Sequence, residues 1–250
     1  MIAHPFLPPT MGPIPDIAWD ICVHADFCGD YCSASGTAGA AQWLVTNVGT
    51  GAGTVTFPAD ELGGVIAVES GSTADDTKIV MLQGANFQTA AANREIVFYA
   101  RFKVEDADED NLFIGLADLA ALTSQNVLAL TFTSSGSFEG VGFYADHAAA
   151  GTATLKYAVG TGAAVSAGST GLTMADGTYY EVAFKITNRQ KVEFWVKISG
   201  VWTRVSTVDN TGSTTYLSTD VLELFIQEKT RDTGADWLKV DRLLVAQQGR

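Results

Sequence analysis

A stretch near the N-terminus holds the residues best suited to metal chemistry. Cys22, Cys28 and Cys32 lie close together, and His24 stands between the first two. A zinc site needs about four N or S ligands, and structural sites usually supply them as two close pairs such as C-x2-C. The spacing here is C-x5-C-x3-C with one histidine, so we expect free thiols and no metal. Because an odd number of cysteines is not typical of a secreted disulfide framework, synthesis in a reducing cytoplasm is predicted.

An acidic run, Glu105 to Asn111, opens with the D-x-D-x-D rhythm of a calcium loop. The EF-hand pattern then requires Gly at the sixth position and Glu at the twelfth. Counted from Asp106, this chain has Asn111 and Ala117 at those positions. We therefore expect a solvated turn between strands, while calcium held in another loop geometry stays open as an alternative.

Catalytic motifs are absent from the sequence. The Glu-x-Asp-x-x-Glu pattern of a retaining glycosidase does not occur, and Glu139 and Asp146 lie seven residues apart in the chain. Gly-x-Ser-x-Gly and His-Glu-x-x-His are also missing. The glycine-rich stretches 49–53 and 160–162 lack the Gly-Lys-Ser/Thr ending of a phosphate loop. We expect a protein that is not an enzyme and has no catalytic residue, cofactor or metal.

Large aromatic side chains offer a different chemistry. Trp195, Trp202 and Tyr99 are expected to be exposed. Aromatic faces pack on pyranose rings, but large aromatics also anchor protein interfaces. Of these two roles, the sequence favours anchoring between subunits.

The overall composition limits which partners are plausible. The 250 residues are 47% hydrophobic and 17% charged, which excludes a disordered chain. The net charge of -13 opposes contact with nucleic acid and with anionic membranes. No apolar run approaches the roughly 20 residues of a membrane-spanning helix. Because few charges leave much uncharged surface, we expect a component of an assembly.

The N-terminus is predicted to be an extended arm over residues 1–18. Four of the six prolines stand within the first 13 residues, and Pro15 follows. Proline-rich backbone cannot complete a ladder on a central strand, so we expect the arm to lie on a neighbouring subunit or an underlying shell. With the two tryptophans above, its apolar side chains form the predicted interface: Phe6, Leu7, Met11, Ile14, Ile17, Trp19, Trp195 and Trp202.

The rest of the chain, 19–250, is predicted to be a single β-sandwich domain. Its hydrophobic residues alternate with polar ones at a period of two, which is typical of half-buried strands. The clearest runs are 95–104, 178–187 and 191–198, and Ser199-Gly200 is a predicted hairpin turn into 201–208. Further strands are expected at 65–69, 78–82, 112–117, 127–132, 138–144, 154–159, 221–227 and 237–246. One short helix is expected around 118–124. The fold class is all-β, an antiparallel two-sheet jelly-roll sandwich.

Several strand motifs carry a family resemblance. Gly63-Gly64-Val65, the run 94–104, Phe113-Ile114-Gly115-Leu116-Ala117-Asp118 and the closing run 238–246 follow one another as in concanavalin-like (laminin G-like) sandwiches. The resemblance covers about 63–246 and bears on fold more than on function.

A narrower resemblance is to structural proteins of tailed bacteriophages, in which an arm precedes such a sandwich. It implies a non-enzymatic virion structural protein of the capsid decoration (cement) type. Its partners would be further copies of itself, as a homo-oligomer, and the major capsid or tail protein. It would be made in the host cytoplasm and located in the virion. The alternative is a lectin-like carbohydrate-binding module whose partner is a glycan.

Overall fold

The computed structural model describes most of the chain in segments. These are Pro8 and residues 19–25, 32–33, 43–48, 53–56, 64–73, 76–89, 94–107, 111–118, 138–145, 153–187, 190–212, 214–230 and 236–248.

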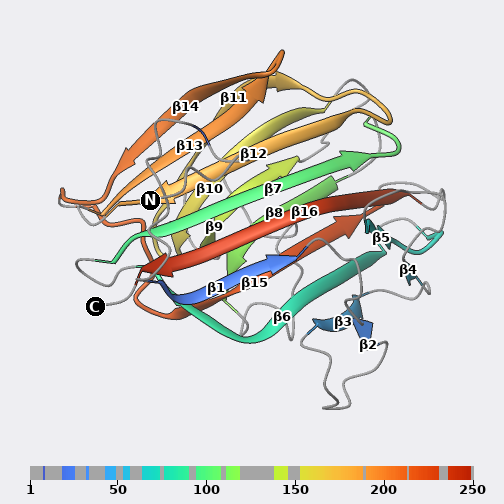
Figure 1. The fold of residues 1–250 in the computed structure, drawn as a ribbon, viewed down its shortest axis with the longest axis horizontal. Helices are drawn as coiled ribbons and strands as arrows, with labels where there is room; N and C mark the ends of the chain where they lie inside the picture. Colours follow the sequence, from blue (N-terminus) through green and yellow to red (C-terminus); the bar gives the residue numbers. More distant parts are fainter. Residues whose placement is uncertain are drawn as a thin grey trace.

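In the part of the chain that the structure describes, two eight-stranded sheets lie one over the other (Figure 1). The first sheet has the order β14-β13-β12-β7-β16-β5-β4, and β1 also pairs with β16. Its strands are β1 (Trp19–Ala25), β4 (Val55–Thr56), β5 (Ile66–Glu69), β7 (Ile96–Val104), β12 (Tyr179–Ile186), β13 (Lys191–Ile198), β14 (Val201–Asp209) and β16 (Trp237–Gln248).

The second sheet has the order β11-β10-β9-β8-β15-β6-β3-β2. Its strands are β2 (Cys32–Ser33), β3 (Trp43–Val48), β6 (Thr77–Gln88), β8 (Asn111–Ala117), β9 (Glu139–Ala145), β10 (Thr154–Thr161), β11 (Val165–Thr173) and β15 (Val221–Lys229). Every pairing among the described strands is antiparallel except that of β2 with β3, which is parallel. The predicted two-sheet sandwich is confirmed.

Alternating residues of each central strand enter the core between the sheets. On β7 these are Ile96, Phe98, Ala100, Phe102 and Val104, as the period-two pattern predicts. The same pattern correctly predicts the inward residues of β12, which are Tyr180, Val182, Phe184 and Ile186.

The β13–β14 hairpin confirms one prediction and corrects another. Ser199 and Gly200 both have positive φ, 50° and 82°, and Ile198 pairs with Val201 across the turn. Two central residues of positive φ are the signature of a type I′ hairpin turn. The period-two pattern of 191–198 also predicts that Ile198 faces inward with Val192, Phe194 and Val196, and this is wrong, because Ile198, next to the turn, is 38% exposed.

Strands at the margins are harder to predict than those at the centre. The sequence of β11, Val-Ser-Ala-Gly-Ser-Thr-Gly-Leu-Thr, alternates poorly because an edge strand buries little. The expected strand at 127–132 lies outside the described residues, and so does the expected helix beyond Asp118.

Of the arm, the structure describes Pro8, and this residue is buried within its own chain. Its docking on a neighbouring subunit stays a prediction. In the described part of the chain, no helix has the length and apolar character needed to span a membrane.

Candidate functional site: a carboxylate cluster at the end of the second sheet

Three carboxylates meet where neighbouring strands of the second sheet end or begin. Asp118 directly follows β8, Glu139 is the first residue of β9, and Asp220 directly precedes β15. These strands are adjacent in the order β9-β8-β15. One carboxylate oxygen from each residue lies within 4.8 Å of the others. The cluster therefore depends on the sheet order and not on closeness in sequence.

Backbone and side-chain hydrogen bonds fix this arrangement. The Asp118 N–H donates to the Glu139 carbonyl at 3.1 Å, which places the two residues opposite each other at the end of the β8–β9 ladder. The hydroxyl of Ser218, a buried residue before β15, donates to the Glu139 carboxylate and accepts the Asp220 N–H at 2.9 Å. Thr89 Oγ1 in turn donates to the Ser218 carbonyl at 3.0 Å. The segment before β15 is thus tied to the start of β9 and to Thr89, which directly follows β6.

The electrostatics of the cluster are unfavourable for negative charge. Burial raises the pKa of the Glu139 carboxyl, and the Ser218 hydrogen bond opposes this shift. The charges of Asp220 and Asp118 raise the Glu139 pKa further. Burial, and to a lesser extent the charge of Asp118, raises the pKa of the Glu223 carboxyl on β15. Glu223 is 7% exposed, and its Oε2 atom has no hydrogen-bond partner among the described residues. Like charges are therefore held together at partly desolvated positions.

This donor set fits a hard divalent cation. Carboxylate oxygens suit Ca²⁺, Mg²⁺ and Mn²⁺, whereas the described cluster contains no histidine or cysteine for zinc. Retaining glycosidases also bring carboxylates together, but as a pair about 5–5.5 Å apart that flanks the scissile bond. Three carboxylates that all lie within 4.8 Å of one another match a shared cation better than such a pair.

This cluster is not among the residues predicted from the sequence. The next acidic residue after Glu139 in the chain is Asp146, which lies outside the described residues, and Asp118 stands at the start of the expected helix. The sequence does carry one signal, which is an acidic residue beside or at one terminus of each of three strands: after β8, at the start of β9 and before β15. Without the order of the strands in the sheet, that signal does not indicate a site.

The expected exposure of three aromatic residues, Tyr99, Trp195 and Trp202, is corrected by the structure. Tyr99 is 1% exposed and Trp195 is 6% exposed, and Trp202 is partly buried against them. The residues do lie on the outer face of the first sheet, as the alternation requires. However, Arg204 lies over the Trp195 ring at 5.6 Å, and Trp202 meets the Tyr99 ring edge-on at 6.2 Å. The rings of Tyr99 and Trp195 are therefore not free to stack on a sugar.

The structure places the remaining predicted residues, in the arm, the cysteine stretch and the acidic run, as follows. The arm residues Phe6, Leu7, Met11, Ile14 and Ile17 lie outside the described residues, and Trp19 begins β1. Their role in an interface stays a prediction. In the cysteine stretch, Cys22 belongs to β1 and Cys32 to β2. The acidic run leaves β7 at Glu105 and enters β8 at Asn111, so it is a connection between strands as expected.

Comparison with solved structures gives matches over nearly the whole chain. Lectin II from Ulex europaeus matches at a TM-score of 0.59 and 10% identity, over 93% of this chain and 100% of that one. Lectin UEA-II complexed with galactose matches at a TM-score of 0.56 and 10% identity, over 93% and 100%. A protein of unknown function from Shewanella oneidensis MR-1 matches at 0.56 and 14% identity, over 94% and 90%. This chain has a lectin-like, concanavalin-like fold.

Identities this low establish the fold alone. Neither protein-family models nor curated proteins give a match to the sequence. The concanavalin-like part of the predicted resemblance is confirmed. None of the three structures is described as a virion protein, so the capsid or tail partners, the homo-oligomer and the virion location stay predictions.

Proposed function

We propose that this chain is a carbohydrate-binding protein of the lectin type, without catalytic activity, and that its carboxylate cluster holds a divalent cation. The observation that carries the proposal is the meeting of Asp118, Glu139 and Asp220 on a lectin-like fold. Support for the ligand class comes from the fold matches, among them a lectin complexed with galactose. The lectin interpretation therefore takes precedence over the capsid interpretation.

A cation would act on the second sheet through charge. When bound, it supplies a fixed positive charge that offsets the repulsion among the three carboxylates. Asp118 and Glu139 stand opposite each other at the end of the β8–β9 ladder, where like charges are destabilising. Asp220 ties the start of β15 to the same point. Cation binding would thus hold three strand ends in one arrangement.

The cation is tested first. Thermal unfolding of the full chain is compared in chelator and in CaCl2, with MnCl2 as a second probe. At a concentration of 100 Kd, a bound cation adds about 2.7 kcal/mol, which corresponds to a rise of roughly 5–10 °C in Tm for a chain of this size. Glu139→Gln and Asp220→Asn should abolish most of this rise. Glu193→Gln, which removes a carboxylate from the first sheet, should leave the rise unchanged.

The ligand is tested on a glycan array, with and without chelator. Binding that chelator weakens and that Asp220→Asn weakens would support the proposal in full. Glycan binding indifferent to chelator would refute the role of the cation but not the lectin function. If the array shows no binding while the chain is found in purified virus particles, the capsid interpretation replaces the lectin interpretation.

A further inference from the structure

The outer face of the first sheet carries an apolar row that is shielded from water. One cluster of buried residues on this face consists of Val97, Tyr99, Ala183, Trp195 and Leu244. Their neighbours along the strands enter the core, so these side chains project outward. Each of the five is at most 6% exposed. Because the outer face of an antiparallel sheet is commonly solvated, exposures this low mean that other parts of the chain lie over the row.

Described side chains account for part of this cover. Arg204 and Trp202 lie over part of the row. The charged residues beside the row are themselves shielded, since the side chains of Lys185 and Glu181 are only 17% and 20% exposed. Lysine and glutamate are mostly exposed in folded proteins. The cover therefore extends beyond the aromatic rings to the charged residues next to them.

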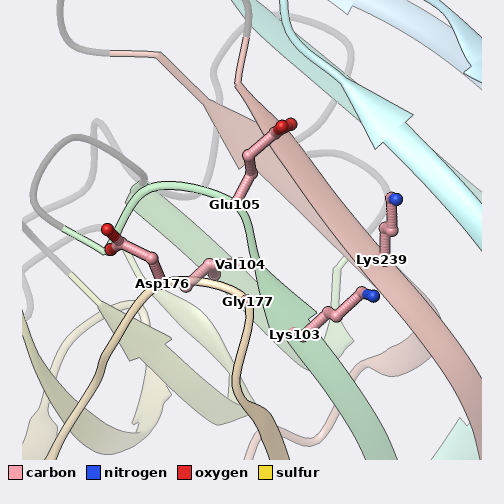
Figure 2. Close-up of a pocket in the computed structure, with 6 residues that line it drawn as sticks. All are labelled: Lys103, Val104, Glu105, Asp176, Gly177 and Lys239. Carbon is pink, nitrogen blue, oxygen red and sulfur yellow. The ribbon is translucent and has the colours of Figure 1, made fainter.

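The end of the same face has a different character. Lys103 stands four residues after Tyr99 on β7 and pairs with Lys239 of the neighbouring strand β16 (Figure 2). These two lysines share an open pocket of about 360 Å³ with the carboxylates of Glu105 and Asp176. Charges of both signs are balanced there. The apolar row, and not this charged end, is thus the part of the face that suits an uncharged segment.

The Trp195 indole indicates what the covering segment must supply. Its Nε1 atom is buried and has no hydrogen-bond partner among the described residues. An indole N–H can only donate, and it usually finds an acceptor when it is buried. Proline-rich backbone offers such acceptors, because a polyproline II segment makes no internal hydrogen bonds. Segments of this kind also dock on surfaces lined by aromatic side chains.

The N-terminal arm, residues 1–18, has the composition and the attachment for this role. It contains five prolines, one carboxylate, Asp16, and no lysine or arginine. It leads into Trp19, the first residue of β1, which pairs with Gln248 of β16. Pro8, the residue of the arm that the structure describes, is buried. The arm is therefore attached to the sheet that carries the apolar row.

The arm is also long enough to cross the sheet. Trp195 lies on β13, four strands away from β1 in the sheet order. At about 4.8 Å between strands, this distance is roughly 19 Å. Residues 8–18 reach roughly 34 Å at about 3.1 Å per residue. The other long stretches outside the described residues, 34–42 and 119–137, each join two strands of the second sheet.

We infer that residues 1–18 lie across the outer face of this chain's own first sheet and cover its aromatic row. The exposures given above are those of a single chain, so the cover requires no neighbouring subunit. The arm is then a strap. While docked, it withholds Tyr99, Trp195 and Trp202 from sugars and from other subunits, and its release exposes them. The inference does not depend on the proposed carbohydrate-binding function.

Photo-cross-linking of the full chain tests where the arm lies. Phe6 is replaced by p-benzoylphenylalanine, and an equal mixture of ¹⁵N-labelled and unlabelled chains is irradiated. Mass spectrometry should find the arm joined to peptides of β7, β12, β13 or β14, with both peptides of each pair carrying the same label. The control places p-benzoylphenylalanine at Val221, an exposed residue of the second sheet, and should give no such pairs.

Hydroxyl-radical footprinting measures whether the arm shields the row. In the full chain, Phe6→Asp/Leu7→Asp should raise the oxidation rate of Trp195 by about fivefold or more, because two apolar side chains lose their burial and the arm is released. Ala3→Asp/Thr10→Asp adds the same charge to the arm at small side chains and should leave the rate unchanged. Trp43, a core residue of the second sheet, reports any general unfolding.

The outcomes separate this inference from its alternatives. Same-label cross-links to the first sheet, with faster oxidation of Trp195 and not of Trp43, support it. Mixed-label cross-links would overturn it and favour docking of the arm on a neighbouring subunit. Cross-links to the second sheet alone, or an unchanged oxidation rate of Trp195, would also overturn it. If Trp43 is oxidised faster to the same extent, the variant has unfolded, and the cross-links of the chain with the single replacement decide.

Discussion

Phe194 gives the sharpest test of how the two sheets pack together. It belongs to β13 of the first sheet and is fully buried. Its ring stacks on Tyr157 at 4.7 Å and meets Phe143 edge-on at 5.5 Å, and both of these residues belong to the second sheet. Phe184 of the first sheet lies 6.1 Å away. One side chain therefore joins the inner faces of both sheets.

The expected cost of removing this ring follows from its contacts. Phe→Ala at a fully buried site costs about 3–5 kcal/mol, and aromatic pairs such as these place Phe194→Ala at the upper end. At roughly 2–4 °C per kcal/mol for a chain of this size, Tm should fall by roughly 8–20 °C. Phe194→Leu keeps most of the apolar volume and should lose less than half as much. Differential scanning calorimetry of the purified variants measures both changes.

Ile198 supplies the control on the same strand. It is 38% exposed, and Ile198→Ala should change Tm by no more than a few degrees because surface substitutions usually cost within about 0.5 kcal/mol. If Phe194→Ala lowers Tm by no more than Ile198→Ala, the Phe194 ring does not hold the two sheets together.

Two further predictions concern a close approach and a buried charge. Gly115→Ala should lower the free energy of unfolding by about 1–3 kcal/mol, because the new Cβ would lie 2.3 Å from the Val141 carbonyl oxygen and 2.6 Å from Gly142 Cα. The control is Gly212→Ala, whose Cβ would have no atom within 4 Å and which should leave the free energy of unfolding, measured by chemical denaturation, unchanged. Glu223→Gln should raise Tm in chelator at pH 7–8 and leave it unchanged near pH 4. Because the pKa of the Glu223 carboxyl is raised in the folded state, the wild-type protein loses stability as pH rises through that pKa, whereas glutamine cannot ionise. A gain at pH 4 equal to that at pH 8 would contradict this cause.

The centre of the fold is predictable because its local pattern and its tertiary packing agree. In β7, every second residue from Ile96 to Val104 is apolar, and each of these residues enters the core. At the edges this agreement fails. In β11 only Thr170 is buried, so packing places little constraint on which residue types alternate there.

The candidate site is not predictable from sequence because it depends on contacts between distant segments. Asp118 and Glu139 meet only because β8 and β9 pair, and Asp220 joins them only because β15 lies on the other side of β8. The Lys103 and Lys239 pair depends in the same way on β7 lying beside β16. Periodicity identifies the inward face of a strand, but it does not identify the strand beside it.

The burial of Tyr99 and Trp195 also changes where function is to be sought. Had their rings been exposed, the outer face of the first sheet would offer a platform for sugars or subunits. Instead, the described structure gathers carboxylates at strand ends of the second sheet. The net charge of -13 governs how an anion approaches from a distance, whereas its binding depends on charges within about 8 Å at physiological salt. The acidic composition therefore disfavours broad contact with a polyanion such as nucleic acid.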